Sequence, residues 1–67
     1  MIGLGQTAEE YFNKAYDYEE NGEYQLAIDN YTKSLRIFPD NANVYYNRGI
    51  AYRKLGKYED AIADYTK

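Results

Sequence analysis

Adjacent acidic residues are the first feature of this sequence that could carry chemistry. Two carboxylates can act as general acid and base when they face each other across a pocket. Three such pairs are present: Glu9-Glu10, Glu19-Glu20 and Glu59-Asp60. Consecutive residues on a helix point to different sides, so the members of each pair do not face each other. We interpret them as surface acids.

The other residue types that catalysis commonly uses are missing. The sequence has no cysteine and no histidine, which removes the thiolate nucleophile, the commonest metal ligand and the commonest base near neutral pH. It contains no glycine-rich phosphate loop and no metal-ligand spacing. We therefore predict that the chain is not an enzyme and binds no cofactor and no metal ion.

Length and charge narrow the class of partner. The 67 residues carry a net charge of -3, which argues against nucleic acid. No apolar run approaches the roughly 18 residues that a membrane span needs, and the lead Met1–Gly5 lacks the basic start of a signal peptide. These features predict a cytoplasmic protein that binds neither nucleic acid nor a membrane.

The stretch from Tyr24 to Pro39 shows how the chain is organised. Its apolar residues recur at spacings of three and four, which predicts one buried face of a helix over 24–38. That face carries Tyr24, Ala27, Ile28, Tyr31, Leu35 and Phe38. Pro39 is expected to end the helix, because proline lacks an N–H group.

Start and stop signals predict three further helices. Thr7 and Glu10 fit a capping box for a helix over 8–21, which Asn21-Gly22 would end. Asp40-Asn41 offers an N-cap for a helix over 42–55, which Gly56 would end. The last helix is expected to start near Tyr58 and to continue to Lys67. The predicted inward positions are Ala8, Tyr11, Phe12, Ala15, Tyr16 and Tyr18 in the first helix, and Tyr45, Tyr46, Gly49, Ile50 and Tyr52 in the third.

The sequence repeats itself after 34 residues. Residues 8–33 and 42–67 are identical at 11 of 26 aligned positions. Short connections make each pair of helices an antiparallel hairpin. We predict an all-α fold in which such hairpins stack as an α-solenoid of about 1.8 repeats. The divisions are an N-terminal lead (1–7), a first hairpin (8–41) and a truncated second hairpin (42–67).

This pattern resembles the tetratricopeptide repeat, or TPR, family. The residues at its signature positions are Tyr11, Lys14, Ala15, Tyr18, Ala27, Tyr31 and Pro39, then Tyr45, Arg48, Gly49, Tyr52, Ala61 and Tyr65. Ala15 or Gly49 would face Ala27 or Ala61 where the helices of a hairpin cross. Lys14 and Arg48 replace the usual leucine, and we expect their aliphatic stems to cover the same surface with the charge outside.

The resemblance implies a concave groove that binds a protein or peptide. The residues it places there, called the groove residues below, are Glu9, Phe12, Tyr16, Glu19, Asn43, Tyr46, Asn47, Ile50 and Arg53. Phe12, Tyr16, Tyr46 and Ile50 are the expected contacts, because aromatic anchors dominate most interfaces. Alternatively, they pack against neighbouring helices or against Ile2 and Leu4. Only Asn47 matches the carboxylate-binding subset of the family, so that activity is not expected.

An alternative function is self-association as an assembly or scaffold element. Solenoids normally need about three repeats with polar ends, and this sequence contains fewer than two. Residues 8–41 sum to -5 and residues 42–67 to +2. That asymmetry favours head-to-tail or antiparallel pairing of copies, and hairpins could exchange through Asn21-Gly22 or Pro39.

Overall fold

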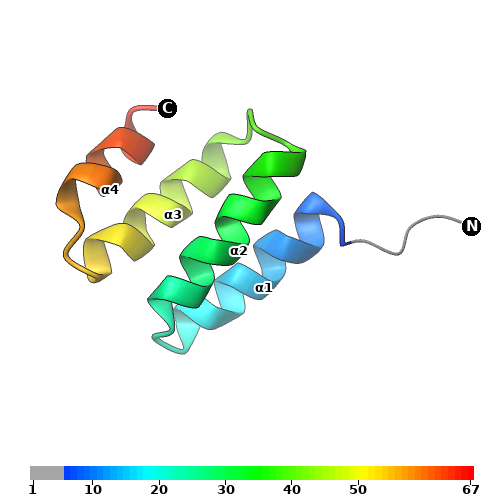
Figure 1. The fold of residues 1–67 in the computed structure, drawn as a ribbon, viewed down its shortest axis with the longest axis horizontal. Helices are drawn as coiled ribbons and strands as arrows, with labels where there is room; N and C mark the ends of the chain where they lie inside the picture. The colour runs from blue at the N-terminus through cyan, green and yellow to red at the C-terminus, as the bar shows by residue number, and fades with distance from the viewer. Residues whose placement is uncertain (1–5) are drawn as a thin grey trace, which may run out of the picture.

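Four α-helices form the fold, as the sequence predicts. The computed structural model describes residues 6–67, within which no strand occurs. The helices are α1 (Ala8–Glu20), α2 (Tyr24–Ile37), α3 (Ala42–Lys54) and α4 (Tyr58–Tyr65). They follow one another across the molecule, with α1 at the N-terminal end and α4 at the other (Figure 1). This is the all-α arrangement of stacked TPR-like hairpins, so the predicted fold class is confirmed.

Local capping explains where the helices begin and end. The Thr7 hydroxyl accepts the Glu10 N–H at 3.1 Å, and the Glu10 carboxylate accepts the Thr7 N–H at 2.9 Å. Gly22 and Gly56 have φ angles of +78° and +81°, the left-handed conformation that ends α1 and α3. After Gly22, the Glu23 N–H donates to the carbonyl of Tyr18 at 2.8 Å, which closes the Schellman turn. The predicted capping box and glycine stops are therefore confirmed.

The helices pack in the order of the chain. α1 packs on α2, α3 packs on α4, and α2 joins the two pairs by packing on α3. The central core consists of Ala15, Ala27, Tyr31, Leu35 and Val44. Tyr31 and Val44 are fully buried, so α3 covers one side of the first pair completely at this point.

Small residues let the helices of each pair approach closely. Ala15 and Ala27 are both fully buried between α1 and α2. In the second pair, a methyl group at Gly49 would lie 2.7 Å from Cε1 of Tyr65 and 3.3 Å from the carbonyl oxygen of Ala61. The expected close crossing is thus present in both pairs.

Two details differ from the sequence-based expectations. α2 ends at Ile37, and Phe38 follows as its C-cap with 53% of its surface exposed, so Phe38 does not belong to the buried face. α4 ends at Tyr65 rather than continuing to Lys67, and the Thr66 hydroxyl donates to the carbonyl of Ala63. Ile2 and Leu4 lie outside the described residues.

The buried face of α3 also differs from the prediction. Val44 and Ala51, which the pattern did not single out, are fully buried, whereas Tyr46 is 59% exposed. Tyrosine and isoleucine dominate the apolar pattern of α3, yet it is Val44 that joins the central core with residues of α1 and α2. Over residues 6–67, no helix is long and apolar enough to cross a membrane.

Arg48 corrects the expectation that its charge lies outside. Its Nε and Nη2 atoms donate to Asp64 of α4 at 2.8 Å each, and its Nη1 atom donates to the Thr32 hydroxyl of α2 at 3.0 Å. The guanidinium also lies 5.5 Å and 5.6 Å from the ring centroids of Tyr45 and Tyr52. Arg48 therefore links three helices.

The ion pair between Arg48 and Asp64 is largely shielded from water, unlike an ion pair on the surface. The Arg48 side chain is 16% exposed and that of Asp64 is 4% exposed. The hydrogen bonds to Asp64 raise the pKa of Arg48, against an opposing effect of desolvation. Lys14 occupies the equivalent position in the first repeat and is exposed, so the two repeats use this position differently.

Candidate functional site

Aromatic side chains gather on the α1 part of the predicted groove. The rings of Phe12 and Tyr16 stack with their centroids 6.5 Å apart. Phe12 also lies 5.7 Å from the ring of Tyr31, which belongs to the core. Tyr16 is 48% exposed, while Phe12 is half-buried. The core thus holds Phe12 in place, and Phe12 in turn supports an exposed ring.

Glu19 is anchored by the core rather than free in solution. The Tyr31 hydroxyl donates to Oε1 of Glu19 at 2.6 Å. Burial raises the pKa of Tyr31 above its usual value, and the hydrogen bond to the Glu19 carboxylate raises it further. A neutral phenol therefore holds this carboxylate at the far end of α1 from Glu9.

The α3 part of the predicted groove is more open. Tyr46 is 59% exposed, and its ring centroid lies 5.7 Å from that of Tyr65 on α4. Asn47 and Ile50 are half-buried, and Arg53 is exposed in the last turn of the helix. The exposed aromatic surface of α3 is therefore supported by α4.

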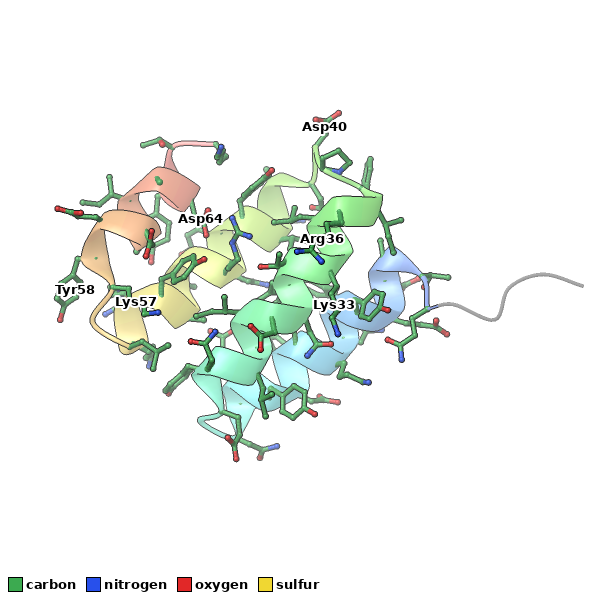
Figure 2. All side chains as sticks on the ribbon, viewed as in Figure 1. Lys33, Arg36, Asp40, Lys57, Tyr58 and Asp64 are labelled. Carbon is green, nitrogen blue, oxygen red and sulfur yellow. The ribbon has the colours of Figure 1, made fainter. Side chains whose placement is uncertain are left out.

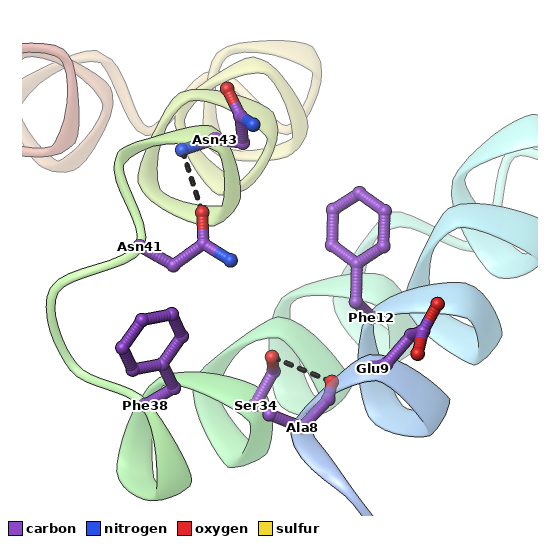
Figure 3. A pocket seen from close by; sticks show the side chains of 7 residues that line it. All are labelled: Ala8, Glu9, Phe12, Ser34, Phe38, Asn41 and Asn43. Atoms are coloured by element: carbon purple, nitrogen blue, oxygen red, sulfur yellow. Dashed lines mark hydrogen bonds between the residues drawn. The ribbon is translucent and has the colours of Figure 1, made fainter.

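A pocket of about 400 Å³ lies where the start of α1, the end of α2 and the start of α3 meet. We call it the corner pocket. Its lining residues are Ala8, Glu9, Phe12, Ser34, Phe38, Asn41 and Asn43. Figure 3 shows the rings of Phe12 and Phe38 on two sides of the open space, with Glu9 beside Phe12. Three groove residues, Glu9, Phe12 and Asn43, thus line one cavity.

Hydrogen bonds fix the polar lining of the corner pocket. The Ser34 hydroxyl donates to the carbonyl of Ala8 at 2.8 Å and ties α2 to α1. Asn41 Oδ1 accepts the Asn43 N–H at 3.0 Å as the N-cap of α3. This bond turns Nδ2 of Asn41 toward the space between the two phenyl rings (Figure 3). The pocket therefore combines apolar walls with an oriented amide donor and a carboxylate.

Sequence reasoning missed the contribution of the loop between α2 and α3. The sequence pattern indicates Asn41 only as a helix cap and predicts Phe38 on the buried face of the second helix. The available signal was the pair Phe38-Pro39: a large apolar residue before a proline leaves the helix and has no neighbouring turn to cover it. Ser34 is buried at the base of the pocket.

The arrangement is suited to binding. Within residues 6–67, no group of three or more histidine, cysteine, aspartate or glutamate side chains could hold a metal ion. Exposed aromatic rings beside a pocket with few polar groups are typical of recognition surfaces. What the site can do chemically is to bury apolar groups and to accept or donate hydrogen bonds at its rim.

Comparison with known proteins agrees with the repeat, the hairpins and the close helix crossings described above. A family model described as TPR repeat matches residues 15–56, well over half of the chain. No curated protein matches the sequence. TPR repeats in general mediate protein–protein interactions and are not catalytic. The chain belongs to the TPR repeat family.

Proposed function

We propose that this protein is an interaction module that binds an extended peptide or partner protein along the groove residues of α1 and α3 and catalyses no reaction. The observation that carries this proposal is the aromatic surface made by the exposed rings of Tyr16 and Tyr46 and the half-buried ring of Phe12, which lines the corner pocket. Family membership supports an interaction role. The cytoplasmic location stays a prediction from the sequence.

The contacts that Phe12 and Tyr46 make with neighbouring rings favour a role for both side chains in binding a partner. The ring of Phe12 packs against that of Tyr31, and the ring of Tyr46 packs against that of Tyr65. Because these contacts already restrict both side chains, each ring loses little conformational freedom when a partner covers it. Such pre-positioned aromatic residues are common among the residues that dominate binding energy. Ile50 and Asn47 lie half-buried on α3 and would supply the neighbouring contacts.

Two substitutions test the groove assignment. A peptide selected from a display library against the folded protein serves as the ligand. We expect Phe12→Ala and Tyr46→Ala each to weaken its binding by about tenfold or more, the usual cost of removing an aromatic anchor. Leu26→Ala is the control, because Leu26 is an exposed apolar residue on α2, outside the groove residues.

Circular dichroism of each variant separates loss of binding from loss of folding. If both variants fold and bind the selected peptide as tightly as the wild type does, the groove assignment is wrong. If the library yields no binder to the folded protein, peptide recognition itself is contradicted.

Self-association is a second candidate function, and one comparison between the repeats favours it. Ile28 is 4% exposed because α3 covers it, whereas its counterpart Ile62 is 61% exposed. Tyr31 is fully buried, and its counterpart Tyr65 is 42% exposed. Tyr58 points outward from the same end of the molecule (Figure 2). We call Tyr58, Ile62 and Tyr65 the end face.

The exposed surface of α1, at the opposite end of the molecule, is poorly suited to pack on the end face of a second copy. Val44 and Ala51 of α3 cover α2, and their counterparts in α1 are Glu10 and Asp17, both exposed. Head-to-tail stacking would bury these two carboxylates against the apolar side chain of Ile62, which is costly. We therefore infer that two copies would pair through their end faces in a closed dimer. Light scattering at micromolar concentration tests this, and a mass of 7.9 kDa would contradict it.

A further inference from the structure

The corner pocket has features that specify the chemistry of a peptide bound in the groove. We propose that it holds a large apolar side chain of the peptide, such as leucine, with a lysine or arginine next to it in the peptide sequence. This inference rests on the proposed function and adds to it the class of peptide. It is argued from the walls, the rim and the charge of the pocket.

The walls select an apolar side chain. Phe12 and Phe38 face the open space from α1 and from the end of α2 (Figure 3). Phe38 is 53% exposed, so covering it removes a large apolar surface from water. Ser34 already donates its hydroxyl proton to the carbonyl of Ala8, so this hydroxyl is not a free donor for a polar side chain.

The size of the pocket admits more than one side chain. A volume of about 400 Å³ lies in the range of small-ligand pockets, which is roughly 300 to 1,000 Å³. A leucine side chain occupies only part of this space. The remainder can take the aliphatic stem of a neighbouring lysine or arginine, which leaves the charged end at the rim.

The rim supplies the charge preference. Among residues 6–67, Glu9 is the only charged residue that lines the corner pocket, and it is exposed. Among the described residues its carboxylate makes no ion pair, whereas that of the adjacent Glu10 accepts the Thr7 N–H. Residues 8–41 sum to -5, so the field around the pocket also favours a cation.

Asn41 supplies an oriented donor for the peptide backbone. Its Oδ1 atom is engaged as the cap of α3, and its Nδ2 atom points between the two phenyl rings. A peptide carbonyl beside the apolar side chain could accept this N–H. Orientation by an existing hydrogen bond lowers the entropy lost on binding.

Titration by NMR tests the inference with defined probes. Three blocked hexapeptides, identical except for a central Leu-Lys, Leu-Gln or Leu-Glu, are added to the ¹⁵N-labelled protein up to millimolar concentration. We expect shifts at Phe12, Asn43 and the Asn41 side-chain amide. We expect Leu-Lys to bind about fivefold more tightly than Leu-Gln, the upper range for an exposed ion pair, and Leu-Glu to bind most weakly.

Variants then test separately the roles of the Glu9 carboxylate and of the Phe38 ring in peptide binding. Glu9→Gln should remove the preference for Leu-Lys over Leu-Gln. Glu20→Gln is the matched control, because it removes the same charge from the exposed far end of α1 and should keep the preference. Phe38→Ala should weaken all three peptides by about tenfold, as the loss of an anchor contact does.

Two results would overturn the inference, and they differ in what they say about the proposed function. Shifts confined to Tyr16 and Tyr46, with no preference among the peptides, would reject the corner pocket and leave groove binding intact. The absence of shifts for the Leu-Lys peptide, together with failure of the peptide library to yield a binder, would reject both.

Discussion

Arg48 shows how one substitution in the repeat pattern changes what a residue does. At the same position of the first repeat, Lys14 extends into solvent. Arg48 instead places a planar guanidinium where Asp64 can accept two hydrogen bonds and Thr32 a third. Arginine suits this site better than lysine because its donors are fixed in a plane that matches a carboxylate. The side chain thereby joins the second hairpin to the first.

The first prediction concerns this ion pair. Arg48→Met should lower the free energy of unfolding by about 3 kcal/mol, because it leaves the buried carboxylate of Asp64 without a partner. Lys14→Met is the matched control and should change the free energy by less than about 0.5 kcal/mol, as surface substitutions usually do. Urea denaturation followed by circular dichroism measures both.

A double variant keeps this prediction testable if Arg48→Met does not fold. Adding Asp64→Leu removes the unpaired carboxylate, and replacing both members of a buried pair by apolar residues is often neutral. The double variant should therefore be more stable than Arg48→Met alone. Equal stability of Arg48→Met and Lys14→Met would show that the pair contributes nothing.

At the scale of the helices, the sequence predicted boundaries better than faces. Capping depends on residues within a few positions of the helix end, so Thr7, Gly22 and Gly56 placed the ends of α1 and α3 to within one residue. Which side of a helix is buried depends on its neighbours. Val44 is buried because it packs into the central core with residues of α1 and α2, and no pattern within α3 contains that information.

The same distinction holds for the candidate site. The family resemblance assigned Glu9, Phe12 and Asn43 to the predicted groove, because each occupies a defined position on the first helix of a hairpin, and all three line the corner pocket. Phe38 and Asn41 lie in the connection between the hairpins, where the direction of the chain after Pro39 decides what each side chain faces. Sequence periodicity does not extend into that connection, so the corner pocket required the three-dimensional structure.

The second prediction concerns the turn that ends α1. Gly22 has a φ of +78°, and no atom lies within 4 Å of the position that a methyl group would occupy. Gly22→Ala should therefore lower the free energy of unfolding by about 1 kcal/mol through backbone strain alone. Asn21→Ala is the neighbouring control and should have little effect, because Asn21 has an ordinary φ of -94°.

Gly56 provides an internal replicate of this measurement. Its φ of +81° and open surroundings match those of Gly22, so Gly56→Ala should have a similar cost. Gly22→Asn should cost less than Gly22→Ala, because asparagine tolerates the left-handed conformation better. If Gly22→Ala is as stable as the wild type, the left-handed turn is not maintained in solution.

At the scale of the whole molecule, the two ends differ in character. The α1 end carries exposed Glu10, Lys14 and Asp17, which suits contact with water. The α4 end carries the end face, where Ile62 and Tyr58 are 61% and 63% exposed. Large apolar side chains that cluster on an exposed surface usually mark an interaction site. The exposed surface of α1 at these positions is therefore charged, and that of α4 is largely apolar.

The last prediction follows from this asymmetry. If two copies pair through their end faces, Ile62→Lys should shift the protein to a monomer at concentrations where the wild type is a dimer, because it would bury a charge at the contact. Leu26→Lys is the control, because it adds the same charge at an exposed leucine on α2, away from the end face, and should leave the dimer intact. Light scattering across a concentration series distinguishes the cases: masses that grow beyond a dimer would indicate head-to-tail stacking, and a dimer that survives Ile62→Lys would exclude the end face as the contact.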